Sequence, residues 1–344
     1  MSTRHTSAAS LPQTVIGVDV GGTKVSVALL HRGRLSEPVL APTDCSSADA
    51  LVDEMVRQIE TLREEAPAPV EGVGIGVPSV IEFATGRVRD SVNVPLSDVP
   101  LREVLEQRLG IPVLVDNDAT CAAFAEAHDE RGELDVQDLV MFTVGTGVGG
   151  GFVLGGRVYR GTTGAAGEIG HTLIDAGLND GGPEVDGFPQ PGSLERLAAG
   201  RALDALALAA ATEHPDSALG RILASTGQVS GRDVVVAGHE GDPQAIAAIA
   251  ELGRRLAIGV ANAINTFDPD VVAIGGGVSS AGELLLGPVR ETAVRFVLPG
   301  VGTRTEIRLA RSGPAAGVRG AALLAREELA VQRHDLHPSG AGAA

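Results

Sequence analysis

The feature that most constrains the fold is a strand–glycine turn–strand pattern that occurs twice. The first copy spans residues 15–30, with Gly21 and Gly22 at its turn. The second begins with the apolar segment 139–144, which runs into the glycine-rich stretch 145–151. Glycine turns let backbone N–H groups approach an anion without obstruction by side chains. The repetition predicts two related halves, each opening with an anion-binding hairpin.

Alternating apolar strands and helical segments predict an α/β fold. The expected strands are 15–19, 25–30, 35–41, 72–77, 112–115, 139–144, 152–154, 157–159 and 271–274. The expected helices are 48–65, 101–109, 193–211, 218–224, 243–266 and 315–329. The chain has no Trp, one Tyr and seven Phe, so its core must consist of aliphatic residues, as suits buried parallel strands.

These segments also predict the domain organisation. We expect a disordered tail at 1–13, an N-terminal lobe of residues 14–118 completed by the helix at about 315–330, and a C-terminal lobe of residues 119–314. A glycine- and proline-rich loop is expected at 175–191 and a second disordered tail at 331–344.

The formal net charge of −17 argues against a nucleic-acid partner and against an anionic membrane surface, since both would repel the chain. Two cysteines without metal or redox spacing fit a reducing cytoplasm. The first 13 residues lack the apolar segment of a signal peptide, and no run approaches 18 apolar residues. We therefore expect a cytoplasmic protein.

Lys24 is the only lysine in the chain, and it ends the segment Asp19-Val-Gly-Gly-Thr-Lys24. A compact ammonium beside two glycines and a threonine suits a phosphate group. Asp19 stands where a carboxylate could hold a metal ion against that phosphate, directly or through water. The alternative is an ordinary hairpin with a surface lysine. A third glycine turn at 275–277 follows a strand and could receive a base or ribose.

Two further groups of polar residues are candidates for chemistry. Asp116-Asn117-Asp118 ends an apolar strand, where a carboxylate could accept a proton from a substrate hydroxyl. Helix capping explains one of these three residues, but not all of them. Glu168, His171 and Glu195 stand among small residues and could clamp sugar hydroxyls. Alternatively, His171 is an ordinary core or surface histidine and Glu195 an acidic residue in a first helical turn.

In combination these motifs resemble the ROK family of repressors, uncharacterised reading frames and sugar kinases. The matching segments, in family order, are Asp19-x-Gly-Gly-Thr-Lys24, Asn117-Asp118, Gly145-Thr-Gly-x-Gly-Gly-Gly151, Gly167-Glu168-x-Gly-His171, Leu194-Glu195 and Ile274-Gly-Gly-Gly-Val278. The resemblance covers about Val15 to Leu329. It implies the duplicated, ribonuclease H-like fold of actin-like ATPases, with two lobes and a nucleotide and sugar cleft between them.

The resemblance also implies roles for individual residues. Asp118 resembles the general base that deprotonates the attacking hydroxyl, and Asp19 resembles the carboxylate that organises Mg²⁺ through water. The implied sugar contacts are Asn93, Asn117, Asp118, Glu168, His171 and Glu195. The implied ATP contacts are Asp19, Gly21, Gly22, Thr23, Lys24, Thr146, Gly147, Gly276 and Gly277. Family analogy alone suggests a homodimer.

One departure from the family pattern concerns zinc. Where zinc-containing relatives have three cysteines before Leu194-Glu195, this chain has Asp186, Phe188 and Ser193. Phe cannot ligate zinc and Ser is a poor substitute for a thiolate. The sequence therefore predicts no structural zinc, and the loop 175–191 must be ordered in some other way.

The expected function is ATP-dependent phosphorylation of a hexose at a primary hydroxyl, with glucose as the first candidate. Another sugar or sugar-like substrate is the alternative: an N-acetylhexosamine, fructose, or a C7 cyclitol of the valiolone or valienol type in secondary metabolism. A non-enzymatic, sugar-sensing regulator is a third possibility. Family repressors carry a helix-turn-helix domain ahead of the first glycine turn, and only 18 residues precede Asp19 here.

Overall fold

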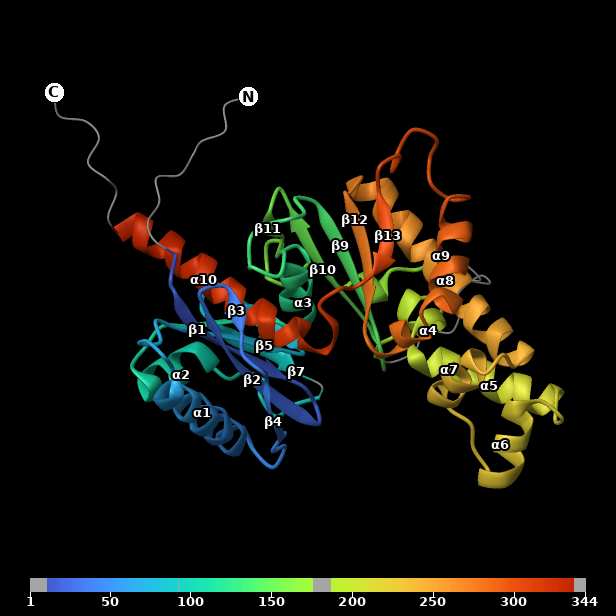
Figure 1. The fold of residues 1–344 in the computed structure, drawn as a ribbon, viewed down its shortest axis with the longest axis horizontal. Helices are drawn as coiled ribbons and strands as arrows, with labels where there is room; N and C mark the ends of the chain where they lie inside the picture. The colour runs from blue at the N-terminus through green and yellow to red at the C-terminus, as the bar shows by residue number, and fades with distance from the viewer. Residues whose placement is uncertain (1–10, 92, 176–186, 337–344) are drawn as a thin grey trace. The chain divides into compact units, whose positions relative to one another are not determined.

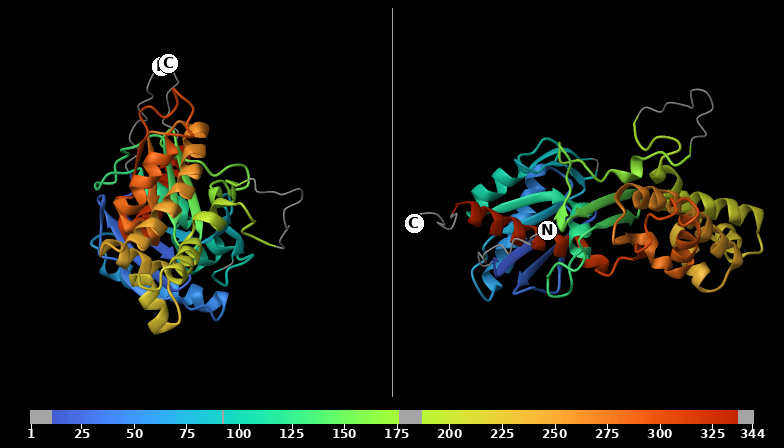
Figure 2. Two further views of the ribbon diagram at one scale, coloured as in Figure 1. Left: turned by 90° about the vertical axis from the view of Figure 1, so that its right-hand side faces the viewer. Right: turned by 90° about the horizontal axis from the view of Figure 1, so that it is seen from above.

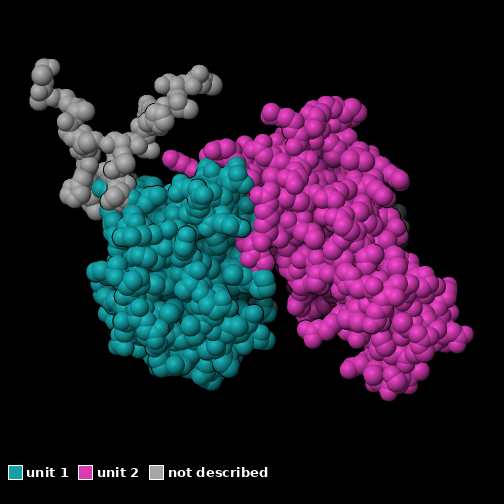
Figure 3. Space-filling view, in the orientation of Figure 1, with its two compact units in different colours: residues 1–135, 160–166, 314–344 teal, residues 136–159, 167–313 magenta. Residues whose placement is uncertain are grey.

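The computed structural model describes residues 11–91, 93–175 and 187–336. The chain divides into two compact units, coloured separately in Figure 3. Unit 1 comprises residues 1–135, 160–166 and 314–344, and unit 2 comprises residues 136–159 and 167–313. The expected boundary after residue 118 differs from this division, because the helix that begins at Asp118 packs within unit 1.

Unit 1 is built on a sheet in which β1 lies between an antiparallel and a parallel neighbour. The strand order is β3-β2-β1-β5-β8, and β4 also pairs with β2. The strands are β1 (Thr14–Val20), β2 (Lys24–His31), β3 (Arg34–Leu35), β4 (Val39–Pro42), β5 (Val73–Val77) and β8 (Val113–Asn117). The single strand expected at 35–41 is wrong. It is divided between β3 and β4, and Pro38, which lacks an N–H donor, lies in the gap.

Helices cover both faces of this sheet (Figure 1). Helices α1 (Ala48–Glu65) and α2 (Leu101–Leu109) contribute to one core with the aliphatic side chains of the strands. Helices α3 (Asp118–Glu126) and α10 (Ala316–Leu336) pack together on the other side. Methyl groups on Gly17 or Gly74 of the sheet would overlap carbonyl oxygens of α10, so these glycines allow the close approach of that helix.

The C-terminal helix is longer than expected. It continues to Leu336, so the disordered tail expected from residue 331 is wrong for residues 331–336. The apolar periodicity ends near Leu329, but the helix continues, and residues 331–333 are exposed. The outer parts of both expected tails, residues 1–10 and 337–344, lie outside the described residues.

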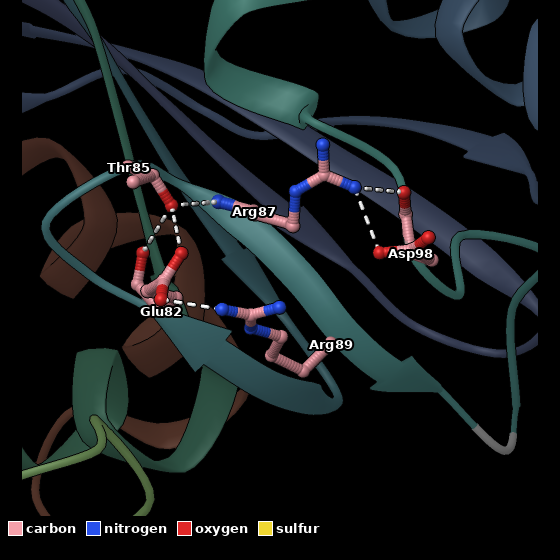
Figure 4. Close-up of polar contacts among 5 residues, drawn as sticks. All are labelled: Glu82, Thr85, Arg87, Arg89 and Asp98. Carbon is pink, nitrogen blue, oxygen red and sulfur yellow. Dashed lines mark hydrogen bonds and ion pairs between the residues drawn. The ribbon is translucent and has the colours of Figure 1, made fainter.

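A small hairpin that the sequence did not predict follows β5. It consists of β6 (Ser79–Glu82) and β7 (Arg87–Ser91). Figure 4 shows its polar contacts: Arg87 Nη1 donates to the carbonyl and carboxylate of Asp98 at 2.7 Å, and Arg89 Nη2 donates to Glu82 Oε1 at 2.5 Å. The Arg89–Glu82 contact joins the two strands of the hairpin, and the Arg87–Asp98 contact ties the hairpin to the segment after it, which contains Asn93.

Unit 2 repeats the sheet topology of unit 1. Its strand order is β11-β10-β9-β12-β13, again with one antiparallel hairpin followed by parallel neighbours. The strands are β9 (Leu139–Val144), β10 (Val148–Leu154), β11 (Arg157–Val158), β12 (Val271–Gly275) and β13 (Glu306–Leu309). The glycine-rich turn is shorter than expected, because Gly149–Gly151 pair with β9 as part of β10. Edge strand β13 was not predicted.

The helices of unit 2 form one aliphatic core with its sheet. They are α4 (Leu194–Ala198), α5 (Gly200–Glu213), α6 (Ala218–Thr226), α7 (Gly231–His239), α8 (Pro243–Phe267) and α9 (Glu283–Ala293). Helices α8 and α9 lie side by side in all views (Figures 1 and 2). The single helix expected at 193–211 is wrong, since extended Ala199 separates α4 from α5.

Helices α7 and α9 were not predicted. Pro288 lies inside α9, where a proline ordinarily argues against a helix.

In the described part of the chain, no helix combines the length and the apolar character needed to cross a membrane. The aliphatic core expected from the scarcity of aromatics is confirmed: among residues 11–91, 93–175 and 187–333, Phe142 is the only aromatic in the set of largest fully buried side chains.

Candidate functional site

The glycine turn of unit 1 is closed by a backbone hydrogen bond and by two side chains that contact its carbonyl groups. Gly21 N donates to Lys24 O at 2.9 Å, and Thr43 Oγ1 donates to Gly21 O at 2.6 Å. The Cys45 thiol lies 3.7 Å from Gly22 O. Gly22, Thr23 and Lys24 are exposed at the tip of the turn. The turn therefore combines exposed backbone N–H groups with the ammonium group of Lys24, as a phosphate site requires.

Asn93 borders this turn. A methyl group on Gly22 would lie 3.6 Å from Asn93 Cβ, within ordinary contact distance. The structure thus brings a residue expected to bind sugar beside one expected to bind a phosphate.

Asp19 lies next to the last residue of β1, and the surroundings of its carboxyl group disfavour the ionised form. Burial, and then the neighbouring negative charge of Asp118, raise the pKa of Asp19 to about 7, while Lys24 opposes the shift. Gly317, in the first turn of α10, packs against this carboxylate: a methyl group there would lie 2.5 Å from Asp19 Oδ2. Only glycine permits this approach of α10.

The three polar residues at the end of β8 have separate functions. Asn117 is the N-cap of α3, and its Oδ1 accepts a hydrogen bond from Thr120 N at 3.0 Å. Buried Asp116 accepts from Arg160 Nε at 2.8 Å. Asp118 is the first residue of α3, and its Oδ1 accepts from Ala119 N at 2.8 Å. Capping therefore accounts for Asn117, and Asp118 is the carboxylate near Asp19.

The glycine turn of unit 2 is the meeting point of three elements. Glu195 Oε2, in the first turn of α4, accepts from Val148 N at 2.8 Å, and a methyl group on Gly147 would overlap the same oxygen. Gly200, which begins α5, donates from its N to Gly145 O at 2.7 Å. Gly276, after β12, lies against the backbone of Val144. Thr146 is exposed at the tip of this turn.

Glu168 and His171 lie in a turn that rests on β10. A methyl group on Gly170 would overlap Val148 O, and one on Gly167 would lie 2.7 Å from Gly150 O. His171 Nε2 is 3.7 Å from Glu168 Oε2, and both side chains are partly exposed. Because Val148 also donates to Glu195, the residues expected to bind sugar in unit 2 gather at the start of β10.

The third glycine turn begins where β12 ends. Gly276 has a φ of 84°, in the region that favours glycine, and Gly277 has open space around it. The two residues follow the end of β12, beside the end of β9. Within unit 2, the expected nucleotide residues Thr146, Gly147, Gly276 and Gly277 therefore share one edge of the sheet.

The positions that hold cysteines in zinc-containing relatives have other contacts here. Buried Ser193 is the N-cap of α4, and its Oγ accepts from Arg196 N at 3.3 Å. The ring of Phe188 meets His171 edge-on, at 5.1 Å between centroids. Asp186 lies outside the described residues. Among the described residues, no group of three or more His, Cys, Asp or Glu side chains is placed to hold a metal ion.

Backbone pairing holds both ends of the loop expected at 175–191. Ile174 N donates to Gly192 O at 2.8 Å and Leu194 N donates to Thr172 O at 2.8 Å. These bonds connect the turn that carries His171 to the helix that carries Glu195.

Sequence reasoning missed three supporting residues: Thr43, Arg160 and Gly317. Thr43 and Arg160 act through contacts with residues far away in the sequence, so no local pattern could reveal them. A glycine in the first turn of a predicted helix was a usable signal for Gly317, because such a residue often marks a close approach.

The repeated sheets, each with a glycine turn between its first two long strands, define an actin-like ATPase fold. Among solved structures, a ROK family glucokinase from Streptomyces griseus in complex with glucose and AMPPNP has a TM-score of 0.75 at 33% identity, over 91% of this chain and 99% of that chain. ROK hexokinase from Thermus thermophilus also has a TM-score of 0.75, at 35% identity over 92% of this chain and 99% of that one.

The ROK family model matches residues 15–328, so the chain belongs to the ROK family. Among its relatives, glucokinase from Halalkalibacterium halodurans is 34% identical over 91% of this chain and 95% of its own length. N-acetyl-D-glucosamine kinase from Aliivibrio fischeri is 33% identical over 90% of this chain and 98% of its own length. The fold and family expected from the sequence motifs are thereby confirmed.

Proposed function

We propose that this sugar kinase of the ROK family transfers the γ-phosphoryl group of ATP to the primary 6-hydroxyl of glucose. The observation that carries the proposal is the position of Asp118 at the start of α3, close enough to Asp19 to raise the pKa of that residue, in the unit that also holds the Gly21–Lys24 turn. The similarity to glucokinases supports glucose as the first candidate.

Asp118 is the proposed general base. It accepts the proton of the attacking hydroxyl as the oxygen approaches the γ-phosphorus, so that the nucleophile becomes more reactive during bond formation. Asn93, Asn117, Glu168, His171 and Glu195 orient the sugar through their hydrogen-bonding groups. This orientation lowers the entropic part of the barrier.

The two glycine turns are proposed to bind the phosphates. Gly21 to Lys24 and Thr146 to Gly147 offer backbone N–H groups and one ammonium, which stabilise the charge that develops during transfer. Gly276 and Gly277 are proposed to accommodate the adenosine.

Asp19 fits a Mg²⁺ ion, because its buried carboxyl group lies beside a second carboxylate and gains from a nearby cation. When bound with ATP, Mg²⁺ neutralises phosphate charge. Asp19 would hold it through water, together with the phosphates of ATP.

An ADP-release screen tests the function. The enzyme, ATP and Mg²⁺ are combined in turn with glucose, mannose, fructose, N-acetylglucosamine, N-acetylmannosamine and a C7 cyclitol. We expect the highest kcat/KM with glucose. A higher kcat/KM with N-acetylglucosamine would make an N-acetylhexosamine the proposed substrate in place of glucose. This is the main alternative because an N-acetylglucosamine kinase is among the relatives. If none of these compounds causes ADP release and the protein binds DNA in a sugar-dependent way in a gel shift, the non-enzymatic, sugar-sensing regulator would be favoured instead.

We also propose that the protein is a homodimer, by family analogy alone. Light scattering should then give about twice the chain mass of 35.0 kDa. A monomer at micromolar concentration would contradict this part of the proposal without affecting the chemistry.

A further inference from the structure

A short segment between the strands of unit 2 belongs to unit 1. Tyr159 before it and Gly167 after it are part of unit 2, whereas residues 160–166 are part of unit 1. We call residues 160–166 the crossover segment. Gly164 anchors it through its backbone, since a methyl group at this position would overlap Ile81 O. The residues that follow the crossover segment in the chain include Glu168 and His171.

Arg160 is the main side-chain anchor of the crossover segment. Its Nε donates to Asp116 Oδ2 at 2.8 Å and its Nη2 donates to Glu328 Oε1 at 3.1 Å. Its guanidinium carbon also lies 3.5 Å from the centroid of the Phe83 ring. The Arg160 side chain is 16% exposed and that of Asp116 is 6% exposed. A charged pair this far from water depends on both partners, because removing one leaves the other buried and unpaired.

The ion pair reaches the proposed catalytic residue through Asp116. The second carboxylate oxygen of Asp116, Oδ1, accepts from Asn117 N at 2.9 Å. Asn117 in turn caps α3, whose first residue is Asp118. One guanidinium therefore fixes the carboxylate that orients the backbone immediately before Asp118.

We propose that Arg160 is a positioning residue for phosphoryl transfer, acting through Asp116 on the Asn117–Asp118 backbone. This inference rests on the proposed function. Arg160 touches neither substrate in the proposal. Its loss would misplace a base and sugar-binding groups, and a displacement of the order of 1 Å at a reacting group can cost about a hundredfold in rate.

Arg102 provides a matched control. It lies on the same Phe83 ring, with its guanidinium carbon 5.7 Å from the centroid, and it is partly buried. It donates to the carbonyl oxygens of Phe83 and Ala84, at 2.6 and 2.9 Å. Arg102→Ala removes a comparable set of packing and polar contacts but leaves the hydrogen-bonded ion pair of Asp116 with Arg160 in place.

The test compares wild type with R160K, R160A, R102A, D116N and R160K/D116N by sugar and ATP kinetics, with circular dichroism to measure the folded fraction. In R160K we expect the sugar KM to rise about tenfold, kcat to fall about tenfold and the ATP KM to change less than about threefold. R160A should show larger losses in the same parameters. R102A should stay within about twofold of wild type per folded molecule. If Arg160 acts through Asp116, R160K should lower kcat much less in the D116N background.

The outcomes separate this proposal from the function on which it rests. Wild-type protein that releases no ADP with any sugar would overturn both. An active wild type, with R160K and R160A as active per folded molecule as R102A, would overturn the positioning proposal alone. Additive effects of R160K and D116N would also overturn it, because the two residues would then act independently. If R160A does not fold, the kinetics of R160K and the double-mutant cycle with D116N still test the positioning proposal.

Discussion

At the scale of single residues, the proposed site rests on two neighbouring carboxylates. Asp19 is the next-to-last residue of buried strand β1, and Asp118 begins a helix within range of its charge. Because burial and this charge raise the pKa of Asp19 to about 7, its ionised form is costly in the isolated protein. Such a cost is expected where a residue is retained for binding a cation rather than for stability.

Asp19→Asn should therefore stabilise the protein at neutral and alkaline pH. Between the unfolded pKa, near 3.8, and about 7, folded Asp19 keeps a proton that the unfolded chain has lost, so the unfolding free energy of the wild type falls as pH rises. The gain from Asn should grow through this window and level off above it, at about 2 to 4 kcal/mol. Calorimetric melting at about pH 5 and about pH 8 measures the gain, and equal melting temperatures of the two proteins at both pH values would contradict the account.

Asp118→Asn should lower kcat by about a hundredfold to ten-thousandfold, since the amide cannot accept the proton. The amide oxygen can still accept the hydrogen bond from Ala119 N, so α3 and sugar binding should be preserved. Kinetics together with calorimetric titration of glucose measure both effects. Near-normal turnover would remove Asp118 from its proposed role.

At the scale of elements, glycines allow backbones to approach one another around both turns. Gly17 and Gly74 allow α10 to lie close to the sheet of unit 1, and Gly317 allows the first turn of α10 to approach Asp19. In unit 2, Gly147 admits the Glu195 carboxylate and Gly170 admits the turn that carries His171. A side chain at any of these positions would separate an element from the site it supports.

Gly147→Ala tests this packing. The added methyl group would displace Glu195 from Val148 N, so we expect a loss of about 1 to 3 kcal/mol in stability and a fall in kcat/KM of at least about tenfold. Gly145→Ala, two residues earlier, has open space for the methyl group and should leave the melting temperature unchanged. Equal stability of the two variants, measured by thermal melting, would show that the Glu195 contact does not hold the turn.

The long elements could be predicted from the sequence because each carries its own signal. Strand β1, helix α1 and helix α8 show uninterrupted apolar runs or helical periodicity, and they lie at or near their expected bounds. The β6–β7 hairpin could not be predicted, because its polar surface is stabilised by contacts with Asp98 beyond the hairpin. Helix α9 escaped prediction because Pro288 conceals its periodicity.

In both units, the residues of the candidate site could be predicted from the sequence, but their contacts could not. Motif residues such as Asp118 and Gly147 could be identified from the family pattern, and the structure gives them specific contacts. The contact of Glu195 with Val148 N, across 47 residues, could not, since only the folded chain brings α4 to the start of β10. The same holds for Arg160 and Asp116, which are 44 residues apart.

At the scale of the whole molecule, the same sheet topology occurs twice with different helices added. Each copy places a glycine turn between the first two long strands, and each adds carboxylates of its own: Asp19 and Asp118 in unit 1, Glu168 and Glu195 in unit 2. This duplication supports the proposal that each glycine turn is an anion-binding element.

The central claim is that the glycine turns bind nucleotide, and calorimetric titration of Mg²⁺ and AMPPNP tests it most directly. Gly22→Ala and Gly145→Ala form a matched pair, one in each unit, because the fold has room for the methyl group at either position. We expect one nucleotide per chain in the wild type and affinity about tenfold or more weaker in each variant, a loss of at least ~1.4 kcal/mol. No nucleotide binding by the wild type, or a variant in either turn with unchanged affinity, would contradict the claim.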